Sequence, residues 1–283
     1  APLERLLARM VPLMRLPRLI QKGHLTALAV TASSYSSGEH VTFYESAQAV
    51  QPWVRSQRKA ARDRITHEHL LASSAIPFVF PAKGITIDGH TEYFGDGSMR
   101  QSAPIAAAIH LGAERVLVIG AGRMHEPRGD STAPPSPSYP SLAQIAGHAL
   151  SNIFLDALSV DVERVQRINQ TLSLIPEEKR THSALRPVEL LVIAPSQRLD
   201  AIAARHVGDL PGPVRTMLGA LGVTSNMADV RGAALASYLL FEQGYTQELM
   251  ALGRADTLAR RADVCRFFGW KDTGAALRTR LPT

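Results

Sequence analysis

The chain has 283 residues, of which 45% are hydrophobic and 20% are charged, so it can bury a core as one large domain or two smaller ones. Lys and Arg number 31 against 25 Asp and Glu, and this net charge of +6 is weaker than the excess of dedicated nucleic-acid-binding proteins. A single cysteine, Cys265, excludes an internal disulfide framework and a cysteine-cluster zinc site, and it is typical of a reducing compartment.

The first 22 residues mix basic and apolar side chains, and no run in the chain reaches the roughly 18 apolar residues that span a bilayer. The spacing favours a core-facing helix that is broken near Pro12 and Pro17 and keeps its basic face in water. A basic amphipathic helix on a membrane surface is the alternative interpretation. The apolar residues are too interrupted for a signal peptide.

Leu25–Ser33 is nearly all apolar and predicts a buried strand, followed by the serine-rich turn Ser33–Gly38 and a second strand, Val41–Tyr44. Ser56–Leu71 has helical spacing and predicts a helix with a solvated basic face. Aromatic residues are missing after Trp53, which argues against nucleic-acid contact there.

Two short strands, Ile85–Ile87 and His90–Phe94, flank Asp88-Gly89, a dipeptide typical of two-residue hairpin turns. The hairpin leads into the glycine-flanked turn Gly95–Ser98. We therefore expect the carboxylate of Asp96 to lie just beyond the end of a strand.

The rest of the chain to residue 197 alternates between helices and strands. Pro104–Leu111 and Leu142–Leu172 predict helices, whereas Arg115–Ile119 and Val188–Ala194 predict strands. Five prolines between 126 and 141 predict an exposed loop. This alternation is typical of a layered α/β domain. From residue 198 onward the spacing is helical, so we expect an α/β domain over 1–197 and a helical C-terminal extension over 198–283.

Asp96 is the strongest candidate for chemistry, because it stands between Gly95 and Gly97 and is followed by Ser98. Glycines on both sides remove the Cβ obstacle, so another backbone or a substrate can approach the carboxylate. A partly buried carboxylate can act as a general base toward a serine hydroxyl. Taken alone, this pattern also fits an ordinary structural turn.

An ordered series of motifs resembles the second half of the patatin-like phospholipase family over roughly residues 1–197. The series runs through Ile65–Pro81, Tyr93–Ser98, Pro104–Ala106 and Leu111–Gly120. The resemblance implies a partial patatin-like three-layer α/β sandwich. In that family the aspartate of a D-G-G or D-G-A motif is the base for a serine nucleophile, and Asp96 and Gly97 match its first two positions. Ser98 stands at the third, a departure that leaves the base assignment in place.

The family's G-x-S-x-G nucleophile elbow and its glycine-rich oxyanion loop do not occur in these residues. Ser36 is the nearest approach, but Ser34 replaces the first glycine and the residues after Gly38 predict a strand instead of a helix. We therefore expect a truncated form whose serine lies upstream of Ala1, inactive on its own.

The resemblance implies hydrolysis of a phospholipid or neutral-lipid acyl ester by a serine–aspartate pair, with no metal or cofactor. It also implies a cytoplasmic protein and leaves peripheral contact with a membrane open, as well as the oligomeric state. A noncatalytic module on the same scaffold, binding a membrane surface or a protein, is the alternative.

Two further motifs receive less weight. Gly120-Ala-Gly122 resembles the start of a dinucleotide fingerprint, but the third glycine position is His125. His67 and His69 are two residues apart, so on a helix they point to different faces and do not suit one metal ion. Thr66 before them fits a helix N-cap.

Overall fold

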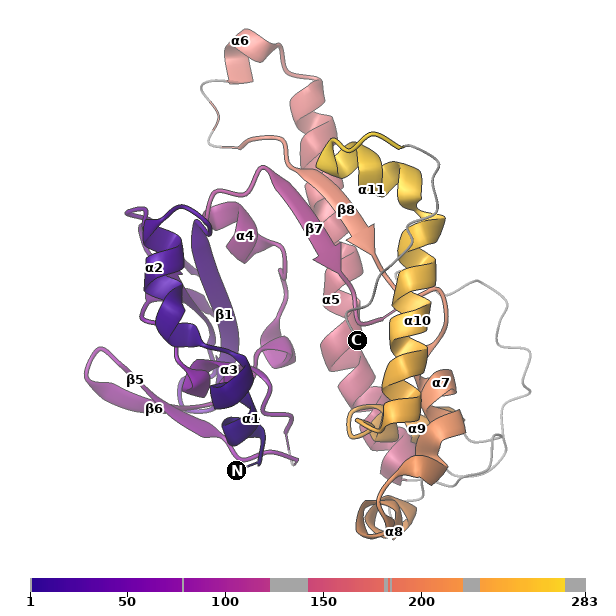
Figure 1. Cartoon of the computed structure of the whole chain (residues 1–283). Helices are drawn as coiled ribbons and strands as arrows, with labels where there is room; N and C mark the ends of the chain where they lie inside the picture. Colours follow the sequence, from indigo (N-terminus) through magenta and orange to yellow (C-terminus); the bar gives the residue numbers. More distant parts are fainter. Residues whose placement is uncertain are drawn as a thin grey trace. The chain divides into compact units, whose positions relative to one another are not determined.

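The computed structural model describes residues 2–77, 79–122, 142–180, 183, 185–220 and 230–272 (Figure 1). The chain divides into two compact units, one of residues 1–114 and 156–188 and the other of residues 115–155 and 189–283. The first holds a six-stranded sheet and the second a two-stranded sheet with most of the later helices. The expected mixed α/β class and helical C-terminal region are therefore confirmed.

The N-terminal helix is broken as the prolines predict. Its pieces are α1 (Pro2–Met10), the 3-10 turn η1 (Leu13–Arg15) and α2 (Leu16–Gln21). Pro17 lies in the first turn of α2, where the N–H that proline lacks has no helical partner in any case. Leu16 and Ile20, one turn apart on α2, are buried in the core of the first unit.

The six strands of the first unit pair in the order β3-β4-β2-β1-β6-β5. They are β1 (Ala27–Ser34), β2 (His40–Ser46), β3 (Val54–Arg55), β4 (Arg58–Arg62), β5 (Lys83–Ile87) and β6 (His90–Asp96). All neighbours are antiparallel except β2 and β4, which are parallel. Alternation along the strands sends Val30, Ala32 and Phe43 into one core with α2 and α3 (His67–Ser73).

The prediction of one helix over Ser56–Leu71 is wrong, because the first part of this segment is a strand. Gln57 takes a positive φ of 57° in the turn between β3 and β4, and β4 then joins β2 in register. Trp53 anchors the connection: its ring stacks on Tyr44 (centroids 5.6 Å apart) and on His110 (4.5 Å). Sheet pairing and this stack outweigh the local helical spacing.

The β5–β6 hairpin is confirmed, with Asp88 (φ 50°) and Gly89 (φ 80°) both in the left-handed region that such turns require. The chain continues through η2 (Gly97–Arg100) to α4 (Ala106–His110). Helix α4 is shorter than expected, and the segment ends at Gly112, whose φ is 101°.

The second unit contains β7 (Arg115–Ile119) and β8 (Glu189–Ile193), which pair in parallel as a strand–helix–strand succession predicts. Helix α5 (Leu142–Ser173) belongs to both units, and α6 (Glu177–Arg180) belongs to the first. The later helices are α7 (Leu199–His206), η3 (Val207–Asp209), α8 (Gly212–Ala220), α9 (Val230–Ser237), α10 (Gln243–Ala259) and α11 (Arg261–Phe268). Ile202, Ala236 and Leu240 lie in one core that residues of α7, η3, α8, α9 and α10 share.

The loop expected over 126–141 lies outside the described residues. Within the described part of the chain, no helix combines the length and apolar character needed to cross a bilayer.

Candidate active site

Asp96 is the last residue of β6, and its backbone is held from two sides. It lies opposite Ala32 of β1 in the antiparallel register, and its N–H donates to the carbonyl of Ala75 at 3.0 Å. The side chain then caps η2, because Oδ1 accepts the backbone N–H of Ser98 at 2.8 Å. The sequence predicts a strand that ends at Phe94 with Asp96 just beyond it, whereas β6 extends two residues further and Asp96 is its last residue.

The two flanking glycines admit atoms of the chain itself. A Cβ on Gly95 would lie 2.3 Å from Tyr35 Oη, and one on Gly97 would lie 2.3 Å from the carbonyl oxygen of Thr31. Both distances are far below van der Waals contact. At Gly97 the obstacle is backbone, so that position requires glycine, whereas at Gly95 it is the end of the exposed Tyr35 side chain, which can shift. The sequence left open whether another part of the protein or a substrate approaches the turn at these glycines. The structure shows that atoms of the protein itself do so.

The environment of Asp96 disfavours its charged form. The residue is only 8% exposed, and burial raises the pKa of its carboxyl group, while the hydrogen bonds from Ser98 oppose the shift. None of the ion pairs between described side chains involves Asp96. The carboxylate also acts on Tyr35: burial and the negative charge of Asp96 both raise the pKa of that phenol. A desolvated carboxylate of this kind can accept a proton.

Buried polar side chains beside this turn were not predicted from the sequence. Ser33 on β1 is paired with His40 on β2 and with Gly95 on β6. Ser33 and His40 are each at most 3% exposed. Burial lowers the pKa of His40 to about 4, although a hydrogen bond with the Gly97 backbone opposes this, so the imidazole is neutral at pH 7. Ser33 Oγ and His40 Nε2 have no hydrogen-bond partner among the described residues. The signal was present in the sequence as polar residues at alternate positions, Thr31 and Ser33.

Ser36 lies in the turn between two antiparallel strands. The β2 strand that follows it begins at His40, as expected for the residues after Gly38. Its Oγ accepts the backbone N–H of Tyr93 at 3.1 Å. This geometry differs from a strand-to-helix elbow, so it gives Ser36 no support as a nucleophile.

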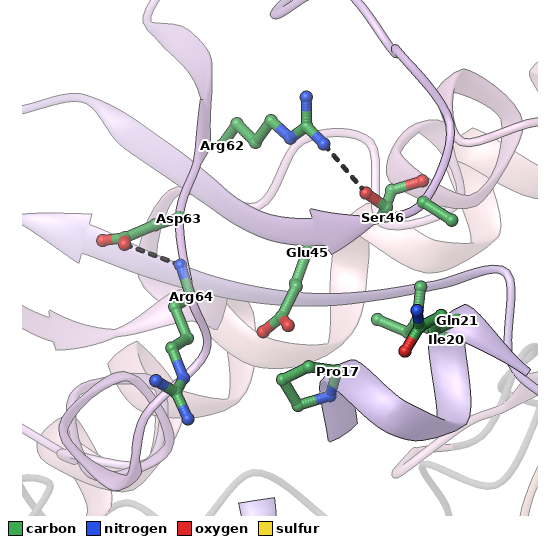
Figure 2. A pocket seen from close by; sticks show the side chains of 9 residues that line it. Pro17, Ile20, Gln21, Glu45, Ser46, Arg62, Asp63 and Arg64 are labelled. Carbon is green, nitrogen blue, oxygen red and sulfur yellow. Dashed lines mark hydrogen bonds between the residues drawn. The ribbon is translucent and has the colours of Figure 1, made fainter. Parts of the chain in front are cut away.

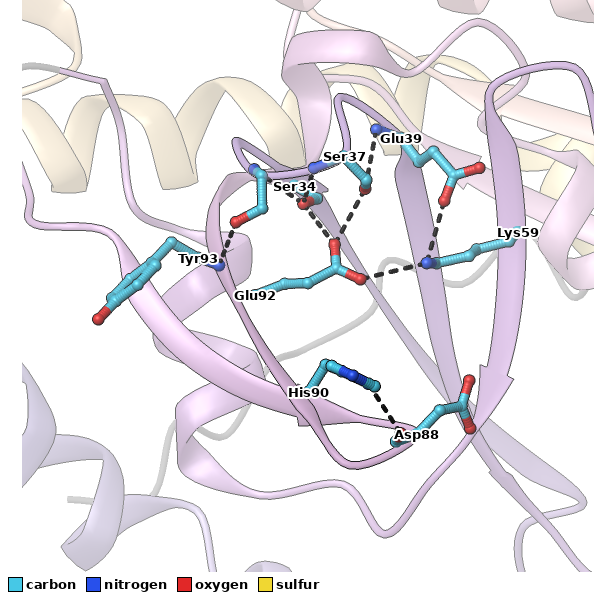
Figure 3. A network of polar contacts seen from close by, with 9 residues as sticks. Ser34, Ser37, Glu39, Lys59, Asp88, His90, Glu92 and Tyr93 are labelled. Carbon is cyan, nitrogen blue, oxygen red and sulfur yellow. Dashed lines mark hydrogen bonds and ion pairs between the residues drawn. The ribbon is translucent and has the colours of Figure 1, made fainter.

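The remaining serines of the turn bind Glu92 of β6 (Figure 3). Ser34 Oγ donates to Glu92 at 2.6 Å and Ser37 Oγ at 2.9 Å, and Lys59 pairs with the same carboxylate at 3.4 Å. The hydrogen bond from Ser34 contributes most to lowering the pKa of Glu92. The network attaches the β1–β2 turn to β6, so it holds the strand that carries Asp96.

The two histidines of α3 have separate structural partners. His67 Nε2 lies 2.8 Å from the carbonyl of Val11, whereas His69 Nδ1 accepts the backbone N–H of Thr66 at 3.1 Å in a capping box. Thr66 is the N-cap, as predicted. Among the described residues, no group of three or more His, Cys, Asp or Glu side chains is arranged to hold a metal ion.

The Gly120-Ala-Gly122 motif follows β7. The backbone N–H of Gly120 continues the pairing with β8 by donating to the carbonyl oxygen of Ile193 at 2.8 Å. His125, at the position of the third glycine of a dinucleotide fingerprint, lies outside the described residues.

A pocket of about 600 Å³ lies at the end of the sheet remote from Asp96 (Figure 2). Its lining comprises Pro17, Ile20, Gln21, Glu45, Ser46, Ala47, Arg62, Asp63 and Arg64. At this end of β1, Ala27 pairs with Ser46, whereas Ala32 pairs with Asp96 at the other end. Much of its polar lining is engaged, since Arg62 donates to the Ser46 carbonyl at 3.1 Å and Glu45 accepts the N–H of Ile65 at 3.0 Å. The pocket is therefore separate from the candidate base.

No protein-family model matches the chain, and searches of curated proteins and of solved structures find no similar protein. The resemblance to the patatin-like phospholipases thus rests on the ordered series of motifs between Ile65 and Gly120, and what it implies for this chain is a proposal.

Proposed function

We propose that the chain is part of a patatin-like lipid acyl hydrolase in which Asp96 is the general base for a serine supplied by residues outside these 283. The observation that carries the proposal is the state of Asp96: a buried carboxylate with a raised pKa, fixed at a strand end beside Gly97, whose place against the Thr31 backbone leaves no room for a side chain. Such a group is held in place and can accept a proton more readily than an exposed carboxylate.

In the proposed reaction the serine hydroxyl attacks the carbonyl carbon of a fatty acyl ester, and its proton passes to Asp96. The tetrahedral intermediate expels the alcohol, which takes the proton from Asp96 and leaves an acyl-serine. Water then attacks the acyl carbon while Asp96 accepts its proton, and returning that proton to the serine releases the fatty acid. Backbone amides for the oxyanion would come from the same outside segment as the serine.

The finer architecture belongs to the same proposal. The mixed sheet with α2 and α3 in its core is compatible with part of a three-layer patatin-like sandwich over 1–197, with 198–283 as a helical extension. A cytoplasmic location, with lipid esters as substrate, follows from the same resemblance.

The test compares the 283-residue chain with the polypeptide read from the same frame upstream of Ala1, both assayed on a short-chain acyl ester and with a serine-reactive fluorophosphonate. We expect no turnover and no labelled serine in the chain alone. In the longer polypeptide we expect turnover that falls by roughly 10³-fold in Asp96→Asn. Asp88→Asn is the matched control, because it removes a carboxylate from the turn of the same hairpin, where asparagine tolerates the positive φ. It should leave turnover unchanged.

The Asp96→Asn variant should remain folded. Because burial raises the pKa of Asp96, the stability linked to its protonated form is present at low pH and is lost as pH rises through the raised pKa. At neutral pH a neutral amide, which can still accept the Ser98 N–H, should therefore be at least as stable in urea denaturation. A marked loss of stability would indicate a structural role for the carboxylate instead.

Other results would overturn the assignment. Ester hydrolysis by the chain alone, or a labelled serine within it, would place the nucleophile inside these residues. Turnover of the longer polypeptide that survives Asp96→Asn would exclude Asp96 as the base, and absence of any turnover would support the noncatalytic alternative.

A further inference from the structure

The N-terminal segment presents more apolar surface than its own packing uses. On α1, Leu3 and Leu7 are half-buried, whereas Leu6 and Met10, also one turn apart, are 51% and 64% exposed. The helix therefore has an inner apolar pair and a second, outer apolar pair.

The same arrangement continues through η1 and α2. Leu16 and Ile20 are buried in the core, while Met14 is 85% exposed and Leu19 is 42% exposed. Figure 1 shows α1 and α2 in indigo at the start of the chain. We call Leu6, Met10, Met14 and Leu19, together with the basic residues below, the N-terminal surface.

Cationic side chains dominate the charge of this surface. Five cationic side chains are exposed along it, namely Arg5, Arg9, Arg15, Arg18 and Lys22. Glu4 is the single acidic residue of the segment. Arg5 and Arg9 are one helical turn apart, as are Arg18 and Lys22. The cations therefore recur along the segment at the same interval as the exposed apolar side chains.

Exposed Leu and Met side chains interleaved with Arg and Lys fit the boundary of an anionic bilayer, where acyl chains accept the apolar groups and lipid headgroups accept the cations. Long basic side chains can reach the headgroups while their methylene stems stay in the apolar layer. We propose that the N-terminal surface docks the protein on membranes that carry anionic lipid. This goes beyond the proposed ester hydrolysis, because it holds whether or not Asp96 acts as a base.

Cosedimentation with vesicles tests the proposal without measuring hydrolysis. We expect the 283-residue chain to bind vesicles of phosphatidylcholine with about 30% phosphatidylserine, and to bind pure phosphatidylcholine at least roughly tenfold more weakly. Binding to the anionic vesicles should also weaken as salt is raised to about 0.5 M. Equal binding to both vesicle types, or binding to neither, would overturn the proposal.

Paired variants locate the surface. Met10→Ser/Met14→Ser and Arg15→Glu/Arg18→Glu alter exposed side chains, so each should keep the fold and weaken anionic-vesicle binding by roughly tenfold. The controls are Met250→Ser, at a methionine of α10 that is 70% exposed, and Arg254→Glu, an exposed cation on the same helix.

Controls that weaken binding as much as the test variants would place the contact elsewhere. Light scattering completes the set: a stable dimer that Met10→Ser/Met14→Ser converts to a monomer would assign this surface to a second copy of the chain and overturn the membrane proposal.

Discussion

At Gly97 the absence of a side chain is a packing requirement. The atom nearest to a hypothetical Cβ is the backbone carbonyl oxygen of Thr31, at 2.3 Å, and Thr31 belongs to a central strand that cannot move without disturbing the sheet. The turn that carries Asp96 is thereby pressed directly against β1. Because Gly97 has no side chain, the turn can pack this closely on β1, and this packing fixes the location of the candidate base.

Gly97→Ala should destabilise the first unit by about 1–3 kcal/mol, the range for overpacking in a well-packed interior. Gly84→Ala is the matched control in the same sheet: its nearest contact is the terminal methyl of exposed Thr91 at 3.3 Å, which can shift. Urea denaturation of both variants measures the difference. Equal stability of the two would contradict the close packing of the turn on β1.

The sequence predicts that Asp96 lies at the end of a hairpin strand, but it does not predict the contacts around it, for a physical reason. Asp88-Gly89 determines a hairpin locally, and counting along β6 places Asp96 at the strand end. The contacts of Tyr35 with Gly95 and of Ser33 with His40 depend on the register between strands, which local spacing does not reveal.

At the scale of elements, one imidazole connects two helices of the second unit. His206, at the end of α7, places Nδ1 at 2.8 Å from Asp209 and Nε2 at 2.8 Å from Glu248 on α10. Glu248 also pairs with Arg205. The hydrogen bonds to Asp209 and then Glu248 are the main causes that raise the pKa of His206 above its ordinary value of 6.5.

The sign of the linkage gives a pH-dependent prediction. The pKa of His206 is higher in the folded state than in the unfolded state. The stability that His206 contributes is therefore fully present at pH values below its unfolded-state pKa and is lost as pH rises through its folded-state pKa. His206→Asn should therefore lose on the order of 1 kcal/mol at about pH 5.5 and clearly less at about pH 9, as expected for a pair near the surface. Denaturation at the two pH values measures this, and equal losses would show that the imidazole acts only by packing.

Strand β4 shows where prediction from local spacing fails. Arg58–Arg62 follows a basic pattern that also fits a helix, and the five residues carry little information on which partner they meet. The partner is β2, reached through a connection that Trp53 anchors between Tyr44 and His110. The long helix α5 and the hairpin β5–β6 are predicted because their signals are local, whereas β4 depends on contacts distant in sequence.

At the scale of the whole molecule, the two compact units have separate cores, one around Phe43 and Ile20 and the other around Ile202 and Leu240. Separate cores favour unfolding in more than one step. Calorimetry should resolve two transitions, of which Gly97→Ala lowers one and His206→Asn at about pH 5.5 lowers the other. A single transition that both variants shift alike would show that the units unfold together.

The chain has two tryptophans, and each unit contains one of them. Trp53 is enclosed between two rings in the first unit, whereas Trp270 of the second is 61% exposed and stacks on Phe268 at 4.6 Å. The protein thus carries two indole fluorophores in contrasting surroundings. Replacing either one with phenylalanine leaves a tryptophan emission that reports on a single unit when excitation is at wavelengths that tyrosine does not absorb, without any attached dye.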